Sequence, residues 1–123
     1  MIKNAVVGDG CIVEDSKLTR CVISSRSFIR SGSVLNNVVM MGADNYETDA
    51  EFAENDALGQ PHLGIGHNCR ISGAIIDKNT RIGDGVELSP DGKEDGTFEH
   101  GVVIRDGVLV VPKGISVPAG YKL

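Results

Sequence analysis

The sequence predicts an all-β fold, a single-stranded parallel β-helix built from six-residue repeats. Residues 65 to 88, "IGHNCRISGAIIDKNTRIGDGVEL", place Ile or Leu at positions 65, 71, 76, 82 and 88, in steps of six and five residues. An α-helix has a period of 3.6 and an ordinary strand a period of two, so neither explains these steps. Aromatic residues make up 4% of the chain, so a core must come from Ile, Val and Leu.

The same spacing recurs before and after this stretch. It separates Val7 from Val13, and it continues through Ile23, Ile29, Leu35 and Met41 and later through Val111, Val117 and Leu123. Three such repeats close one triangular coil, and the recurring aliphatic residue points inward. Residues that tolerate turn conformations are expected at the corners, namely Gly8, Gly10, Asn37, Gly66, Asn68, Asn79, Gly83 and Gly85.

Two stretches interrupt the repeat, near residues 43–62 and at residues 89–101, and we expect both to be loop excursions from one domain spanning residues 1–123. The first contains six acidic residues and no basic residue between 43 and 60. Thr48, followed by Glu51, forms a capping-box pattern that predicts a short helix. Loops on a rigid scaffold often carry function, although charge alone favours a solvated acidic loop.

The composition excludes several classes of partner. The net charge is −5 and no basic run is present, which argues against nucleic acid or an anionic membrane as the main partner. No stretch of about 18 apolar residues is present to span a membrane. Cys11, Cys21 and Cys69 include no CxxC pair, so free thiols in a reducing, cytoplasmic compartment are expected. No cofactor is expected.

Outward-facing aliphatic side chains predict self-association. Doublets such as Val6-Val7, Val22-Ile23 and Ile75-Ile76 direct one side chain into the core and its neighbour outward. A short β-helix also has open ends. Because exposed apolar surface and open ends are covered by other copies of a chain, we expect a homo-oligomer, with a trimer favoured by the triangular cross-section.

Two specific motifs resemble a known family. The stretches "MMGADNYETD" (40–49) and "LGIGHNCRISGAIIDKNTRIGDGVEL" (63–88), with "VVPKGISVPAG" (110–120), are similar to the C-terminal β-helix domain of glucose-1-phosphate adenylyltransferase (ADP-glucose pyrophosphorylase), of the cyanobacterial and plant type. The resemblance covers nearly the whole chain. It implies a left-handed β-helix in an oligomeric enzyme of glycogen or starch synthesis, opposite in hand to the usual crossover.

The resemblance also implies a function. Enzymes of this family join ATP and glucose 1-phosphate into ADP-glucose and pyrophosphate, with Mg²⁺, in an N-terminal nucleotidyltransferase domain. The chain contains no glycine-rich loop of the GGxGTRLxPLT kind, so it is expected to lack that domain and to be non-catalytic by itself. The expected role is oligomerisation and allosteric regulation. The alternative is a stand-alone binding or scaffold protein for phosphorylated metabolites.

Three basic residues are candidates for an effector site. The resemblance places two anion-binding lysines at Lys78 in "AIIDKN" and at Lys113 in "VVPKG", where they would bind phosphate or sugar-phosphate effectors. Without the second excursion they are about 22 residues apart, a little over one coil, so they are expected to lie close together. Arg26 in "SSRSF" sits at a matching turn and could add charge. Alternatively, all three are ordinary solvated side chains.

The histidines suggest two less favoured enzymes. His62 and His67, five residues apart, could join His100 in a zinc site like that of β-helix carbonic anhydrases, but zinc requires convergent ligands that nothing in the sequence indicates. A β-helix acyltransferase would need a histidine base between subunits, for which His67 is the candidate, and a coenzyme A groove. We therefore expect no catalytic residue and no metal site.

Overall fold

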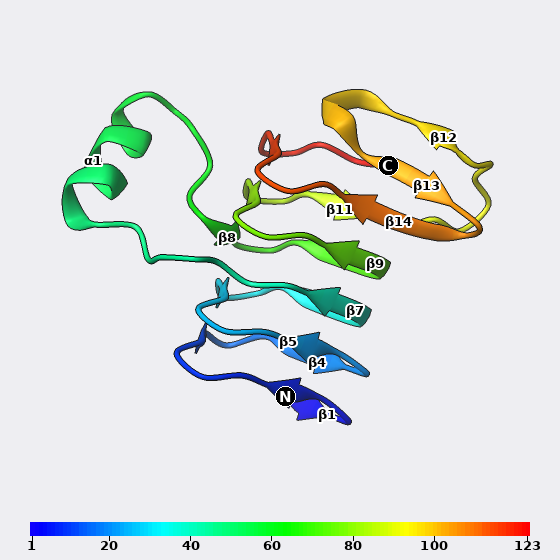
Figure 1. Ribbon diagram of the computed structural model, residues 1–123, viewed down its shortest axis with the longest axis horizontal. Helices are drawn as coiled ribbons and strands as arrows, with labels where there is room; N and C mark the ends of the chain where they lie inside the picture. Colours follow the sequence, from blue (N-terminus) through cyan, green and yellow to red (C-terminus); the bar gives the residue numbers. More distant parts are fainter.

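The computed structural model describes residues 1–123. Short strands wind into a stack of coils, with one helix standing beside the stack (Figure 1). The larger sheet contains ten strands: β1 (Ile2–Lys3), β2 (Val6–Val7), β4 (Lys17–Thr19), β5 (Val22–Ile23), β7 (Val34–Met40), β9 (Arg70–Ile76), β11 (Glu87–Leu88), β12 (Gly96–Thr97), β13 (Val103–Arg105) and β14 (Val108–Val111). The smaller sheet contains β3 (Ile12–Val13), β6 (Phe28–Ile29), β8 (Gly64–Ile65), β10 (Arg81–Ile82) and β15 (Ser116–Val117).

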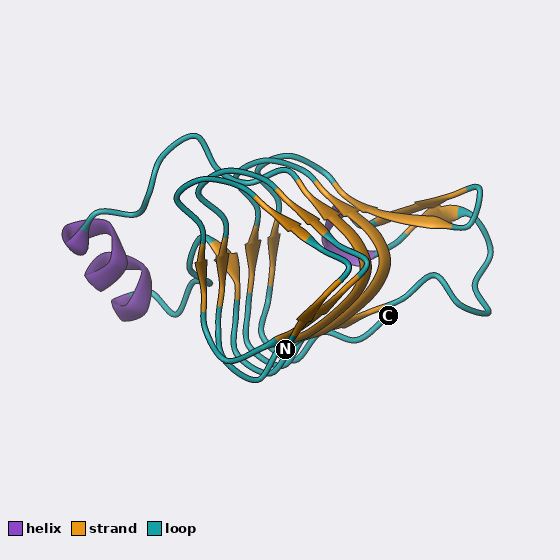
Figure 2. Cartoon of the chain, turned by 90° about the horizontal axis from the view of Figure 1, so that it is seen from below, coloured by secondary structure: helices purple, strands orange, loops and turns teal.

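Parallel pairing between successive coils defines the architecture. All strand pairings are parallel except β12 with β13 and β13 with β14. Figure 2 looks along the stack and shows the coils superimposed, with strands on two sides. Neighbouring coils are therefore about 4.8 Å apart, the spacing of hydrogen-bonded strands.

The core consists of aliphatic ladders inside the coils. Ile29 pairs with Ile65, Ile65 with Ile82, and Ile82 with Val117, and all four side chains are fully buried. Burying each such side chain contributes about 1.5–3 kcal/mol to stability. The residues at 65, 71, 76, 82 and 88 are all buried, so the prediction from this stretch is confirmed.

Two of the predicted inward residues are exposed in the structure. Met41 was expected inside the coil, but its side chain is 42% exposed and Met40 is buried in its place. Asn37 adopts a φ of 59° within β7, and this turn shortens the step from Leu35 to the ladder residue Met40 to five. The in-register strand β9 makes the same five-residue step. Val7 is also exposed, since β2 in the terminal coil pairs on one side only.

The corner residues fall into two physical classes. Gly10, Asn37, Asn68, Asn79 and Gly85 have positive φ angles, as their turn role predicts. Gly83 is required for a different reason, because a Cβ there would lie 2.5 Å from the Ala119 backbone nitrogen of the next coil. The repeat therefore needs glycine both for turns and for the close approach of neighbouring coils.

Between β7 and β8 the chain leaves the stack as a segment that we call the arm (residues 41–63). It carries α1 (Asp49–Ala57), and no residue of this helix is buried. The predicted capping box is present: Glu51 N donates to Thr48 Oγ1 and Thr48 N donates to Glu51 Oε1, each at 3.1 Å. A 3-10 turn, η1 (Glu99–Gly101), follows β12. No helix has the length and apolar character needed to cross a membrane.

Candidate functional site

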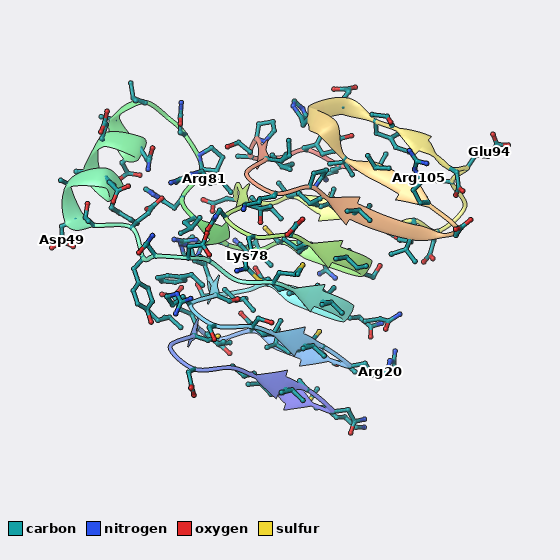
Figure 3. All side chains as sticks on the ribbon, in the orientation of Figure 1. Arg20, Asp49, Lys78, Arg81, Glu94 and Arg105 are labelled. Atoms are coloured by element: carbon teal, nitrogen blue, oxygen red, sulfur yellow. The ribbon has the colours of Figure 1, made fainter.

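One corner of the stack brings the two candidate lysines together. Gly114 N donates to Lys78 O at 3.0 Å, so Lys113 lies at the same corner position as Lys78 on the next coil. Their Cα atoms are therefore about one coil spacing apart, roughly 4.8 Å. Lys78 is half-buried and Lys113 is exposed. Figure 3 shows Lys78 on the side of the stack that faces the arm.

An acidic residue of the arm faces these lysines. Lys78 Nζ lies 3.3 Å from Asp44 Oδ1, and Asn79 Nδ2 donates to Asp44 Oδ2 at 3.0 Å. The hydrogen bonds from Asn79 and Lys78 hold the pKa of Asp44 below its usual range, and the charge of Lys113 acts in the same direction. The corner thus contains two ammonium groups and one carboxylate, and an incoming anion would compete with Asp44.

Arg26 lies at the same corner but further along the stack. Its backbone nitrogen donates to Asp9 O, and on the following coils Ala43 N donates to Ser25 O and Asn79 N to Gly42 O. The coil of Ala43 therefore lies between the coils of Arg26 and Lys78, which are two coil spacings apart. Its Nε donates to Ala43 O at 2.7 Å, and its guanidinium forms no ion pair. Its side chain therefore holds the start of the arm and does not touch the two lysines.

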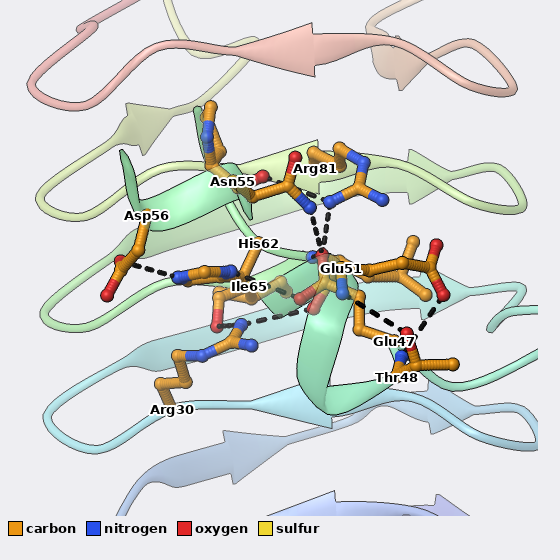
Figure 4. A network of polar contacts seen from close by, with 11 residues as sticks. Arg30, Glu47, Thr48, Glu51, Asn55, Asp56, His62, Ile65 and Arg81 are labelled. Carbon is orange, nitrogen blue, oxygen red and sulfur yellow. Dashed lines mark hydrogen bonds and ion pairs between the residues drawn. The ribbon is translucent and has the colours of Figure 1, made fainter. Parts of the chain in front are cut away.

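A second polar centre fixes the arm to the coils (Figure 4). The Glu47 carboxylate accepts hydrogen bonds from Arg81 Nη1, from Leu63 N at 2.9 Å and from Asn55 Nδ2 at 3.2 Å, and it lies 3.1 Å from His62 Nδ1. Burial raises the pKa of Glu47, but the donors around it outweigh burial and leave the pKa below its usual range. Glu47 thereby connects both ends of the arm to β10.

Comparison with known proteins decides the family. The sequence profile described as GLGC left-handed parallel β-helix domain matches residues 1–121. The chain belongs to this family. The match confirms the resemblance to glucose-1-phosphate adenylyltransferase and the left-handed winding.

Two plant proteins of this family are similar to the chain over nearly its whole length. The glucose-1-phosphate adenylyltransferase small subunit, chloroplastic/amyloplastic, of Triticum aestivum is 36% identical over 121 residues, which are 97% of this chain. The chain spans 26% of that protein's length, about a quarter. A glucose-1-phosphate adenylyltransferase small subunit of Zea mays is 38% identical over 125 residues, covering 97% of this chain and 98% of the relative.

The histidines of this GLGC-type domain do not converge. His62 Nε2 lies 2.9 Å from Asp56 Oδ1, and its ring stacks on Phe52 with centroids 3.7 Å apart. His67 contacts a serine hydroxyl on the neighbouring coil, and His100 packs edge-on against a tyrosine near the C-terminus. No group of three His, Cys, Asp or Glu side chains is arranged to hold a metal ion.

Several charged residues of the site are not indicated by the sequence. Asp44, Glu47 and Arg81 meet only because the arm folds back onto the corner and onto β10. The motif "MGADNYETD" contains two of them, and its density of acidic residues is the one available signal. The sequence does not indicate Arg30 as a site residue. In the structure Arg30 is 7% exposed, and its Nη1 donates to the backbone carbonyls of Leu63 and Ile65.

Proposed function

We propose that the chain is an oligomerisation and allosteric-regulatory domain related to glucose-1-phosphate adenylyltransferase, and that its corner lysines bind phosphate or sugar-phosphate effectors. In this proposal residues 1–123 form one β-helix domain, with residues 43–62 and 89–101 as excursions. The observation that carries it is the placement of Lys78 and Lys113 on successive coils of one corner.

The charges at the corner support an anion site. The two ammonium groups are one coil apart and repel each other. A phosphate group bound between them would offset this repulsion and accept hydrogen bonds from both. Asp44 compensates Lys78, whereas Lys113 forms no ion pair. An effector phosphate would therefore take the place of Asp44 and recruit Lys113. Arg26 would add only a screened contribution, since two coils place it about 10 Å away.

Calorimetry with inorganic phosphate and with 3-phosphoglycerate tests this site. The wild-type chain should bind, with an affinity that falls as salt rises, and the Lys78→Ala/Lys113→Ala variant should not. The Lys3→Ala/Lys17→Ala variant is the matched control, because it removes the same charge from two exposed lysines of β1 and β4. If the corner variant and the control bind alike, the effector site is refuted.

We further propose that the chemistry named for the relatives lies outside these 123 residues. The sequence contains no glycine-rich nucleotide loop of the GGxGTRLxPLT kind, and it matches only 26% of the length of the Triticum aestivum relative. The chain mixed with ATP, Mg²⁺ and glucose 1-phosphate should therefore release no pyrophosphate. Measurable turnover that copurifies with the chain would contradict this part of the proposal.

The self-association part of the proposal rests on an exposed aliphatic ladder. Val6, Val22, Val39 and Ile75 are paired in register on neighbouring strands and are 65%, 45%, 41% and 37% exposed. A second copy of the chain would cover them, and a trimer suits the triangular cross-section. Sedimentation at micromolar concentration should show an oligomer that Val22→Lys/Val39→Lys disrupts. A monomeric wild-type chain would refute it.

A further inference from the structure

A cavity of about 310 Å³ lies between the arm and the smaller sheet, away from the corner lysines. Phe28 of β6 lines it on the coil side, and Tyr46 and Phe52 line it on the arm side. Arg26 and Arg30 also line this cavity, and Arg30 in addition lines a neighbouring cavity of about 250 Å³ that contains Asp84. The cavity thus combines aromatic rings with positive charge, and its volume is at the lower end of the range for small-ligand pockets.

Arg30 is the unusual member of this lining. The residue is 7% exposed, its guanidinium lies 4.1 Å from the Phe28 ring centroid, and it forms no ion pair with any carboxylate. Nη1 donates to Leu63 O and Ile65 O, at 3.1 and 3.2 Å, while Nε and Nη2 have no partner in the chain. No buried side-chain polar atom is left unpaired, so these two nitrogens are accessible to solvent.

A nearly buried cation without a counter-ion is energetically unfavourable. Burial lowers the pKa of Arg30, which reports the same cost of desolvation. An anion in the cavity would offset this cost and would accept hydrogen bonds from Nε and Nη2, two donors that lie side by side on one edge of a guanidinium.

The carboxylates of the lining do not supply this counter-ion. Glu47 is occupied by Arg81, His62 and the Leu63 amide. Asp49, in the first turn of α1, is exposed and forms no ion pair. Glu47, Glu14 and Asp84 partly oppose the lowering of the Arg30 pKa through their charges, but none of them forms an ion pair with its guanidinium.

We propose that this cavity binds a small aromatic anion, a single planar ring that carries one carboxylate or phosphate group. The acid group pairs with Arg30 and with the uncommitted nitrogens of Arg26, because guanidinium donors match the oxygens of such groups. The ring packs among Phe28, Tyr46 and Phe52, where offset or edge-on aromatic contacts are favourable. This site does not include Lys78 or Lys113, and Arg26 is the one residue that it shares with the proposed effector site.

The test is an NMR titration of the full 123-residue chain with benzoate and with phenyl phosphate. Benzyl alcohol supplies a ring without charge, and acetate and inorganic phosphate supply charge without a ring. At least one aromatic anion should bind and shift the ring resonances of Phe28, Tyr46 and Phe52, with each control about tenfold weaker or more. Comparison of the two anions tells carboxylate from phosphate. The proposal is overturned if neither aromatic anion shifts these rings, or if benzyl alcohol binds equally well.

Variants separate this site from the rest of the molecule. Arg30→Gln should weaken binding about tenfold or more, whereas Arg20→Gln, at an exposed arginine bonded to Asn36, should leave it unchanged. If Arg30→Gln does not fold, Phe52→Ala decides, because α1 contributes no buried residue and the β-helix should persist without this ring. Lys78→Ala/Lys113→Ala should have no effect here. Full binding by Arg30→Gln, or by Phe52→Ala, would overturn the proposal.

Discussion

Replacing Glu47 with alanine is expected to release the arm while the β-helix stays folded. Glu47 connects the two ends of the arm to Arg81 of β10, and its side chain is 8% exposed. The helix of the arm places no residue in the core, so the arm can detach without opening the aliphatic ladders. The change should therefore appear as local opening of residues 41–63, one of the low-stability units that native proteins contain.

The free energy lost in Glu47→Ala can be estimated from the Arg81 charge that the substitution leaves without a partner. Removing one partner of a buried ion pair costs about 3–5 kcal/mol, because the other charge loses its counter-ion. The Arg81 side chain is 23% exposed and retains some hydration, so about 3 kcal/mol is the appropriate end of that range. This corresponds to roughly a hundredfold increase in the population of the open arm.

Amide hydrogen exchange measures this opening directly. Exchange within residues 49–57 should accelerate by up to roughly a hundredfold in Glu47→Ala, while exchange of Ile71 and Ile82 in the core stays unchanged. Glu54→Ala is the control, because Glu54 is an exposed glutamate on the same helix without a side-chain partner. Equal exchange in the two variants would refute the reasoning that Glu47 anchors the arm.

The same contact gives the arm a defined pH dependence. The pKa of Glu47 is lower in the folded chain than in the unfolded chain, where it is about 4.3. Its stabilisation is therefore fully present above that unfolded value and is lost as the pH falls through the lower folded value. Acidification below about pH 4 should accelerate exchange in α1 of the wild type, and Glu47→Gln should abolish this dependence. An identical pH profile in Glu47→Gln would contradict this assignment.

Three further predictions concern the corner, a turn and the core. Lys78→Ala should raise the pKa of Asp44 towards its usual range in a carboxyl NMR titration, and an unchanged pKa would argue against their contact. Gly64→Ala should lower the free energy of unfolding, measured by urea denaturation, by about 1–3 kcal/mol or more, because φ is +96° and a Cβ would collide with a backbone oxygen. Gly92→Ala is the control and should cost less, because φ is also positive there but the space around a Cβ is open. Leu35→Ala should cost about 2–5 kcal/mol, and a loss below 1 kcal/mol would contradict its full burial.

The repeat made most of the coil architecture predictable. Inward residues such as Ile65, Ile76 and Ile82 follow from spacing alone, since every coil must present an aliphatic side chain at the same place. The error at Met41 shows the limit of that rule. A corner residue with positive φ, Asn37, shortens one step to five. A uniform step of six therefore predicts Met41 inside the coil, whereas the buried residue is Met40.

The sequence predicted only those contacts of the site that depend on the number of residues per coil. The coil count predicted that Lys78 and Lys113 are neighbours, and the in-register pairing of β9 with β14 places them at one corner of successive coils. The contacts of Asp44 and Glu47 depend on how the arm folds back, which no repeat encodes. The lack of a counter-ion at Arg30 likewise depends on three-dimensional packing and has no signature in the sequence.

The most direct test of the central claim is an NMR titration of the ¹⁵N-labelled chain with 3-phosphoglycerate. We predict that amide shifts concentrate at Lys78, Asn79, Lys113 and Gly114, and that they vanish in the Lys78→Ala/Lys113→Ala variant. Shifts that persist in this variant, or that arise away from the corner, would contradict an effector site built from these two lysines.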